Sequence, residues 1–185
     1  MRIGVSGDAG SFSEQASLKY VAANAIAEYS LNYLIDMDGV LAALARAEID
    51  IGVFPFLNST SGVVWPAFCA MGKYNFVPIT EIQLTIEQCL IAKRTTTLAE
   101  IQELYSYPPA FEQCKIFIQR YGFKLVNWGD TARAARDLAA GLLPAHAAVV
   151  GSAAAAKHYG LTLLQAGIQD LQENITHFMV VKPYE

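Results

Sequence analysis

One short stretch constrains this chain most, because an apolar run ends abruptly in a cluster of small polar residues. The run is Ile51-Gly52-Val53-Phe54-Pro55-Phe56-Leu57, and Asn58-Ser59-Thr60-Ser61-Gly62 follows it. Such a change predicts a buried strand that opens into a loop. Residues 63–71 are long enough for two helical turns, so Ser59, Thr60 and Ser61 are candidate N-caps. A helix start of that kind suits a carboxylate or a phosphate, although the same polar residues can simply cap the helix.

The flanking segments predict an α/β protein. Before residue 70 the pattern gives strands and helices in alternation, at 2–6, 13–23, 28–35, 36–47 and 50–56. Two β–α–β passes favour a doubly wound parallel sheet with helices on both faces. Residues 74–93 form a long β-rich run without a helix-length gap. We interpret this run as the crossing between two lobes.

A second α/β set follows the crossing. Its expected strands and helices lie at 104–107, 109–121, 124–128, 130–140, 146–150 and 152–159, and short strands follow at 161–164 and 175–182. The last strand can pair with the N-terminal sheet. We therefore expect a discontinuous lobe 1, residues 1–74 plus 167–185, and an inserted lobe 2, residues 75–166. The cleft between two such lobes is the usual place for a small ligand.

Composition excludes several classes of function. At 54% hydrophobic residues the chain of 185 residues is globular, and its net charge of −4 without a Lys/Arg cluster argues against a nucleic-acid partner. Cys69, Cys89 and Cys114 are widely spaced and odd in number, which argues against a disulfide framework or a zinc site. No apolar stretch is long enough to span a membrane. We expect a soluble cytoplasmic protein without a metal or a cofactor.

Four segments in order carry a family resemblance. They are Ser6-Gly7-Asp8-Ala9-Gly10-Ser11-Phe12-Ser13, Pro55 to Gly62, Tyr105 to Cys114 and Asn174-Ile175-Thr176-His177-Phe178. They resemble the signature segments of prephenate dehydratase, and residues 146–161 are similar to the connecting segment of that family. The resemblance covers nearly the whole chain. It implies two α/β lobes like the type II periplasmic binding proteins, with the active site in the cleft, usually in a homodimer.

The resemblance also implies a reaction, the conversion of prephenate to phenylpyruvate with loss of water and carbon dioxide, in phenylalanine biosynthesis. Thr176 matches the catalytic threonine of the family, and Asn58 and Gln113 match its active-site amides. We assign Thr176 as the donor to the leaving hydroxyl, with Asn58 and Gln113 orienting the ring and its oxygens. Uncharged donors suit a reaction that aromatisation itself drives. The other expected substrate-binding residues are Ser11, Ser59, Thr60, Ser106, Thr131, His177 and Phe178.

The chain departs from the family pattern at several positions. Leu57, Tyr107 and His177 stand where the family usually has glutamate, histidine and arginine, and Asp8 and Ser11 replace a proline and a threonine. Loss of the arginine removes a bidentate partner for a carboxylate, a contact that contributes roughly 1.5–3 kcal/mol. Our hypothesis is that protonated His177, or Arg133 in the helix after Asp130, supplies the missing cation.

Other functions remain open on the sequence. The matched motifs belong to the catalytic part of the family alone, and residues 1–185 contain neither its phenylalanine-sensing ACT domain nor its chorismate mutase domain. One alternative is a diverged relative that decarboxylates prephenate or dehydrates arogenate. Another is a non-catalytic protein that binds a small aromatic anion.

Overall fold

A computed structural model describes residues 1–184 and divides the chain into two compact units. The first unit contains Met1–Asp8, Phe12–Thr85 and the chain from Ile175 onward, and the second contains Ala9–Ser11 and Ile86–Asn174. The sequence places the changes of lobe at 75 and 167 instead. They fall later because β5 (Phe76–Thr85) pairs along its whole length with β11 (Ile175–Pro183), which keeps both strands in the first unit.

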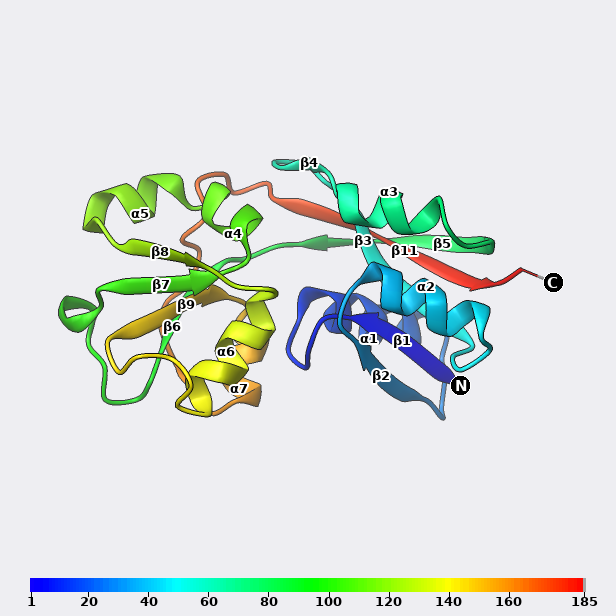
Figure 1. The fold of residues 1–185 in the computed structure, drawn as a ribbon, viewed down its shortest axis with the longest axis horizontal. Coiled ribbons are helices and arrows are strands. Elements are labelled where there is room, and N and C mark those ends of the chain that lie inside the picture. The colour runs from blue at the N-terminus through cyan, green and yellow to red at the C-terminus, as the bar shows by residue number, and fades with distance from the viewer. Residues whose placement is uncertain (185) are drawn as a thin grey trace. The chain divides into compact units, whose positions relative to one another are not determined.

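The first unit is built on one mixed sheet (Figure 1). The strand order is β2-β1-β3-β11-β5, with the short β4 paired to β3. The first three strands in this order are parallel, whereas β11 runs antiparallel to both of its neighbours. The predicted pairing of the last strand with the N-terminal sheet is therefore present. The other strands of this sheet are β1 (Arg2–Ser6), β2 (Ser30–Leu34), β3 (Ile51–Asn58) and β4 (Gly62–Val63).

Three helices cover this sheet. Helices α2 (Met37–Ala45) and α3 (Trp65–Met71) pack on one face, and α1 (Phe12–Ala23) contacts β1, β3 and β5 without joining the α2/α3 core. The α2/α3 core includes Val40, Leu41, Leu44, Phe54 and Val181. Full burial of such side chains stabilises a fold by about 1.5–3 kcal/mol each. Because successive side chains of a strand point to opposite faces, those of β3 and β11 alternate between the α2/α3 side of the sheet and the opposite side.

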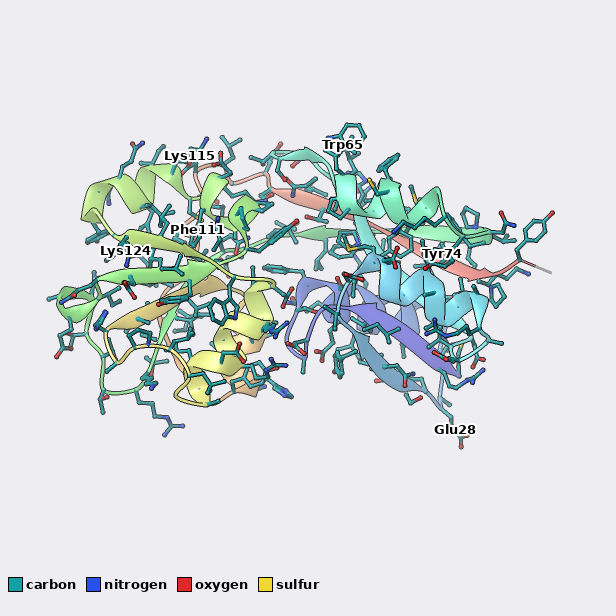
Figure 2. All side chains as sticks on the ribbon, viewed as in Figure 1. Glu28, Trp65, Tyr74, Phe111, Lys115 and Lys124 are labelled. Carbon is teal, nitrogen blue, oxygen red and sulfur yellow. The ribbon has the colours of Figure 1, made fainter. Side chains whose placement is uncertain are left out.

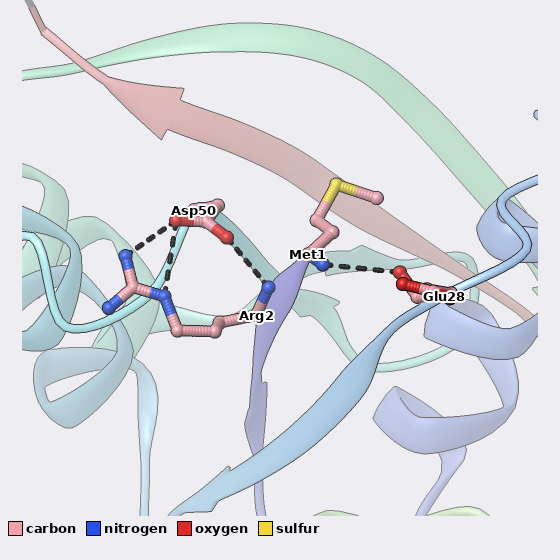
Figure 3. Close-up of polar contacts among 4 residues, drawn as sticks. All are labelled: Met1, Arg2, Glu28 and Asp50. Carbon is pink, nitrogen blue, oxygen red and sulfur yellow. Dashed lines mark hydrogen bonds and ion pairs between the residues drawn. The ribbon is translucent and has the colours of Figure 1, made fainter.

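Polar contacts tie down the N-terminal strand (Figure 3). The Arg2 guanidinium lies 2.6 Å from Asp50 Oδ1, and the Arg2 backbone N–H donates to Asp50 Oδ2 at 2.7 Å. The amino group of Met1 donates to the carbonyl of Glu28 at 3.1 Å. The guanidinium lowers the pKa of the Asp50 carboxyl. These contacts join the start of β1 to the chain just before β3 and just before β2.

The polar cluster after β3 forms a hairpin rather than a helix cap. Leu57 pairs with Val63 and Asn58 with Gly62, so residues 59–61 are the turn between β3 and β4. The helix begins later, at Trp65, where no side chain caps its N-terminus and a proline occupies the first turn. Proline favours that position, which moves the helix start past the serines. The expected capping role of Ser59, Thr60 and Ser61 is therefore wrong.

The second unit is a three-layer α/β/α structure (Figure 1). Its mixed sheet has the order β10-β6-β9-β7-β8. One core lies between the sheet and α6/α7, and a separate core lies between the sheet and α4/α5. The bounds are β6 (Cys89–Ala92), β7 (Glu103–Ser106), β8 (Lys124–Asn127), β9 (Ala147–Gly151), β10 (Thr162–Gln165), α4 (Pro108–Glu112), α5 (Lys115–Tyr121), α6 (Thr131–Ala139), α7 (Ala153–His158) and a 3₁₀ turn Leu98–Glu100.

Figure 2 shows how side chains divide between core and surface. Phe111 of α4 is buried in the core beneath α4/α5, whereas Lys115 and Lys124 have exposed side chains that form ion pairs with Glu112 and Glu103. Trp65 at the start of α3 points away from the fold and is 70% exposed. No helix within residues 1–184 is long and apolar enough to cross a membrane.

The helix expected at 109–121 is two helices. The break falls at Gln113 and Cys114, between α4 and α5. There the Asp170 backbone N–H donates to the Gln113 carbonyl at 2.7 Å, and Asp170 Oδ1 accepts from the Ile116 N–H at 3.0 Å. The segment between β10 and β11 thus satisfies backbone groups that the interruption leaves open. These long-range partners are invisible in a local sequence pattern.

Candidate functional site

In the first unit the structure brings Asn58 and Thr176 into direct contact. They are paired residues of the antiparallel strands β3 and β11. Asn58 Nδ2 donates to Thr176 Oγ1 at 2.8 Å and to the Ile175 carbonyl at 3.3 Å. Both side chains are buried, with 4% and 8% exposure. The pairing of the end of β3 with the start of β11 therefore places the Asn58 amide against the hydroxyl that the sequence singles out.

The other end of the Asn58 amide is also occupied. Asn58 Oδ1 accepts from the backbone N–H groups of Thr60 and Ser61 at 2.9 and 2.8 Å, and from Ser61 Oγ at 3.0 Å. The amide is therefore held in one orientation, with its NH₂ toward Thr176. Across residues 1–184, Thr176 Oγ1 has Asn58 as a donor to it and no acceptor for its own proton. The hydroxyl can therefore donate to a ligand.

Ser59 lies at the same hairpin and holds β11 in register. Its backbone N–H donates to the Ile175 carbonyl at 2.8 Å, and its Oγ accepts from the Ile175 N–H at 2.9 Å. Thr60 and Ser61 are exposed in the turn. The hairpin therefore fixes the residue that precedes Thr176.

His177 occupies the opposite face of β11 from Thr176, because neighbouring residues of a strand point to opposite faces. Its Nδ1 lies 2.6 Å from Glu81 Oε1 on β5, and its ring packs edge-on against Phe56. Hydrogen bonds from Gln83 and then from His177 lower the pKa of the Glu81 carboxyl. His177 is thus engaged with Glu81, and nothing in the strand geometry brings it beside the Thr176 hydroxyl.

In the second unit three amide side chains converge. Gln113 Oε1 accepts from Asn174 Nδ2 at 2.8 Å and from Gln88 Nε2 at 3.0 Å. All three residues are buried: Gln113 is 7% exposed, Asn174 is 1% exposed and Gln88 is 3% exposed. Gln113 Nε2 itself has no hydrogen-bond acceptor among the described residues. Gln113 therefore presents a donor group, which suits a carboxylate, carbonyl or hydroxyl oxygen of a ligand.

The thiol next to Gln113 is an unsuitable nucleophile. Burial, and then the charge of Asp170, raise the pKa of Cys114 to about 12. A thiol with that pKa is protonated at neutral pH. Cys114 is therefore a poor candidate for a catalytic nucleophile.

The remaining predicted site residues differ in how open they are. Ser106 is fully buried and its Oγ donates to the Val150 carbonyl at 2.6 Å, so its proton is already used. Phe178 is 1% exposed within the core. Ser11 is also buried, at 3%, whereas Thr131 at the first position of α6 is partly exposed. The Arg133 side chain is 46% exposed, and its guanidinium lies 3.9 Å from Asp137 Oδ2.

Gln88 and Asn174 were not assigned roles from the sequence. Asn174 belongs to the last of the resemblance motifs, and Gln88 is a polar residue between the apolar ends of two strands. A buried polar residue in such a place needs a hydrogen-bond partner. This signal marks both residues, but it does not identify their common partner Gln113, which lies 25 residues from Gln88 and 61 residues from Asn174.

The described residues form two α/β units, each built on a mixed sheet, and this architecture is typical of the type II periplasmic-binding-protein-like fold class. Within that class, a family model described as prephenate dehydratase matches residues 3–185. The chain belongs to the prephenate dehydratase family, which is named for a hydro-lyase activity.

Individual relatives agree with this membership. The chain is 28% identical over 180 residues to the bifunctional chorismate mutase/prephenate dehydratase of Escherichia coli strain K12, covering 97% of this chain and 46% of that protein. It is 29% identical over 182 residues to arogenate dehydratase/prephenate dehydratase 2, chloroplastic, of Arabidopsis thaliana, covering 98% and 46%. The chain thus spans less than half the length of these relatives.

A solved structure shares the fold. The prephenate dehydratase of Arthrobacter aurescens, determined in complex with L-Phe, superposes with a TM-score of 0.86. The match covers 100% of this chain and 61% of that one at 22% identity. At this identity the likeness concerns the fold.

Proposed function

We propose that this chain catalyses the decarboxylating dehydration of prephenate to phenylpyruvate. The observation that carries the proposal is the Thr176 hydroxyl, which Asn58 holds by a 2.8 Å hydrogen bond while its own proton has no acceptor across residues 1–184. Family membership over residues 3–185 supports the same reaction.

In the proposed step two bonds break, and each of them joins a substituent to the substrate ring. The C–O bond to the ring hydroxyl breaks with its electron pair on oxygen, and that oxygen leaves as water with a proton delivered through the Thr176 hydroxyl. The C–C bond to the ring carboxylate breaks, carbon dioxide leaves, and the released pair completes the aromatic ring. Solvent returns one proton to Thr176, so the reaction consumes one proton overall. Donor assistance of this kind contributes typically about 10²–10⁴-fold.

Asn58 serves this step as a positioning residue. The sequence assigns it to the substrate ring, but its two N–H groups and its carbonyl oxygen already have protein partners. By donating to Thr176 Oγ1, the amide leaves the hydroxyl proton to point elsewhere. The proposed role is therefore to set the direction of the Thr176 hydrogen bond rather than to touch the substrate.

Gln113 Nε2 is the proposed donor to a substrate oxygen, and Ser11, Thr60 and Thr131 remain proposed substrate-binding residues. Arg133 is the proposed cation for a carboxylate, since it is 46% exposed and its contact to Asp137 is long. His177 is the weaker candidate for that role because Glu81 already engages it. An Arg133→Ala variant should raise KM for prephenate with little change in kcat, and an unchanged KM would remove Arg133 from the site.

The test is product identity. Purified protein is incubated with prephenate, and with arogenate in parallel, and the products are separated and identified by mass. Phenylpyruvate with stoichiometric carbon dioxide supports the proposal. A non-aromatic decarboxylated product, phenylalanine formed from arogenate alone, or ligand-induced stabilisation without turnover would each identify one of the other functions that the sequence leaves open.

We also propose that the chain works in the cytoplasm as a homodimer. The three cysteines are unpaired, which fits a reducing compartment. The dimer rests on the family resemblance. Light scattering after size exclusion tests it, since a monomer mass at micromolar concentration would contradict the dimer.

A further inference from the structure

Gln88 has a buried polar side chain to which no role has yet been assigned. It lies in the three-residue link between β5 and β6 and is 3% exposed. Its backbone is held on both sides, because its N–H donates to Gln169 Oε1 at 3.0 Å and its carbonyl accepts from the Ile168 N–H at 2.9 Å. The side chain donates from Nε2 to Gln113 Oε1, and its own Oε1 is buried without a hydrogen-bond partner in the described structure.

An unpaired buried carbonyl destabilises a fold, since it has lost its water without gaining a donor. An apolar side chain of similar shape, such as methionine, could fill the same space without that defect. The backbone contacts of Gln88 do not depend on its side chain. Packing alone therefore does not account for an amide at this position.

The amide does determine the orientation of Gln113. With Gln88 Nε2 and Asn174 Nδ2 both donating to Gln113 Oε1, a flipped Gln113 would place its own NH₂ against two donors. Two separate donors, Gln88 Nε2 and Asn174 Nδ2, thus favour the observed orientation of the Gln113 amide. The same selection turns Gln113 Nε2, which has no acceptor within residues 1–184, toward whatever binds there.

We propose that Gln88 is a positioning residue that locks the Gln113 amide with its NH₂ outward, so that this site accepts ligand oxygens and rejects ligand N–H donors. This inference rests on the proposed function for the identity of the substrate. The chemistry it names is a carboxylate, carbonyl or hydroxyl oxygen of the substrate. The unpaired Gln88 oxygen is a stability defect that accompanies the lock.

The first test separates function from stability. Gln88→Met removes the donor to Gln113 and also the unpaired oxygen. We expect kcat/KM for prephenate to fall by about 10–100-fold, the range that a misplaced binding group costs. The thermal midpoint should stay level or rise. Gln119→Met, at an exposed glutamine of the same unit, is the matched control and should change neither quantity. Loss of activity in parallel with a lower midpoint would overturn the inference.

A double-mutant cycle tests whether Gln88 acts through Gln113. In a Gln113→Met background, adding Gln88→Met should have no further effect on kcat/KM, because there is no amide left to orient. Losses that multiply in the double variant would contradict a positioning role.

The second test is independent of turnover. In ¹⁵N-resolved spectra, the side-chain NH₂ signals of Gln113 are assigned by their absence in Gln113→Met. In Gln88→Met these signals should shift and broaden as the amide samples both orientations, while Gln119→Met leaves them in place. Unchanged Gln113 signals would overturn the inference even if the wild-type protein does not act on prephenate. Shifted signals in a protein without prephenate turnover would support the lock and reject the proposed function.

Discussion

Each unit holds a neutral polar group in a defined direction, the Thr176 hydroxyl in the first unit and the Gln113 amide in the second, but the contacts that do so differ. In the first unit the Asn58 amide has partners on both ends and leaves one hydroxyl proton, that of Thr176, uncommitted. In the second unit three amides converge on one oxygen and leave both a donor on Gln113 and an unpaired acceptor on Gln88. In the first arrangement the unused group is a donor, whereas the second also leaves a buried acceptor without a partner.

The difference follows from what holds each group. Asn58 and Thr176 are opposite residues of paired strands, so the ladder itself places them. Gln88, Gln113 and Asn174 lie outside the helices and strands, so no strand pairing places their side chains opposite one another. We therefore expect substitutions at Asn58 or Thr176 to change a hydrogen bond whose direction the strand pairing fixes, and substitutions at Gln88 to loosen the orientation of the Gln113 amide.

The largest expected effect on activity short of removing the hydroxyl is that of Asn58→Asp. The carboxylate keeps the acceptor for the Thr60 and Ser61 N–H groups but cannot donate to Thr176. Thr176 would then donate to the introduced carboxylate and turn its proton away from the substrate. We expect kcat to fall by about 10²–10³-fold with the fold retained.

Steady-state formation of phenylpyruvate measures this change, and circular dichroism checks the fold. Ser61→Ala is the control, because it removes one of three contacts to Asn58 Oδ1 and leaves the contact to Thr176. A kcat within threefold of wild type in Asn58→Asp would show that the direction of this hydrogen bond is unimportant.

The largest expected effect on stability is that of Gly10→Ala, in the segment of the first loop that belongs to the second unit. Gly10 has φ of +82°, and an added Cβ would lie 2.5 Å from the Ala155 Cα. Because the neighbour is backbone, it cannot move aside cheaply. We expect a loss of about 2–4 kcal/mol in the free energy of unfolding.

Denaturant unfolding measures it, with Gly141→Ala as the matched control. Gly141 has φ of +77° with open space around it, so alanine there should cost only about 1–2 kcal/mol. Equal losses at the two positions would show that the contact with Ala155 contributes nothing.

A smaller effect is expected from Asp170→Ala. Its carboxylate accepts from the Ile116 N–H at the start of α5, so its loss should cost about 1 kcal/mol, as for other helix caps. Asp170→Asn keeps an acceptor oxygen and should retain most of that stability. If thermal unfolding gave both variants the wild-type midpoint, the segment before β11 would not be supporting the helix break beside Gln113.

The smallest effect concerns pH and the first unit. Contacts from Gln83 and His177 lower the pKa of Glu81 in the folded state, so the stability they provide is present above the unfolded pKa of about 4.3 and is lost as the pH falls through the folded value. Solvent screens this exposed group, and such pairs contribute about 0–1 kcal/mol. Glu81→Gln should lower the unfolding midpoint slightly at pH 7 and not at all below about pH 3. A difference that grows toward acid pH would contradict the sign.

Much of the fold was predictable from patterns that are local. The strand at Arg2–Ser6, the cap of α6 by Asp130 and the cap of α7 by Ser152 follow from periodicity and capping chemistry. The break between α4 and α5 was not predictable, because Asp170 supplies its partners from more than 50 residues away. The start of α3 was misplaced because hydroxyl residues suit a hairpin turn as well as a helix cap.

The residue types of the site were predictable from the sequence, but their hydrogen-bond partners were not. The motifs marked Asn58, Gln113 and Thr176, but whether Asn58 touches a substrate or only Thr176 depends on partners that no spacing reveals. The expected cation at His177 depends on which face of β11 it occupies and on Glu81, a residue 96 positions away. Register between distant strands decides both questions.

The central claim is that the Thr176 hydroxyl assists departure of the substrate hydroxyl, and replacing it by Thr176→Val and Thr176→Ser tests this most directly. Valine keeps the shape and removes the donor, whereas serine keeps the donor. We predict that kcat for phenylpyruvate formation falls at least about 100-fold in the valine variant and stays within about tenfold in the serine variant, while prephenate still raises the thermal midpoint of both. Turnover by the valine variant at the wild-type rate would contradict the account.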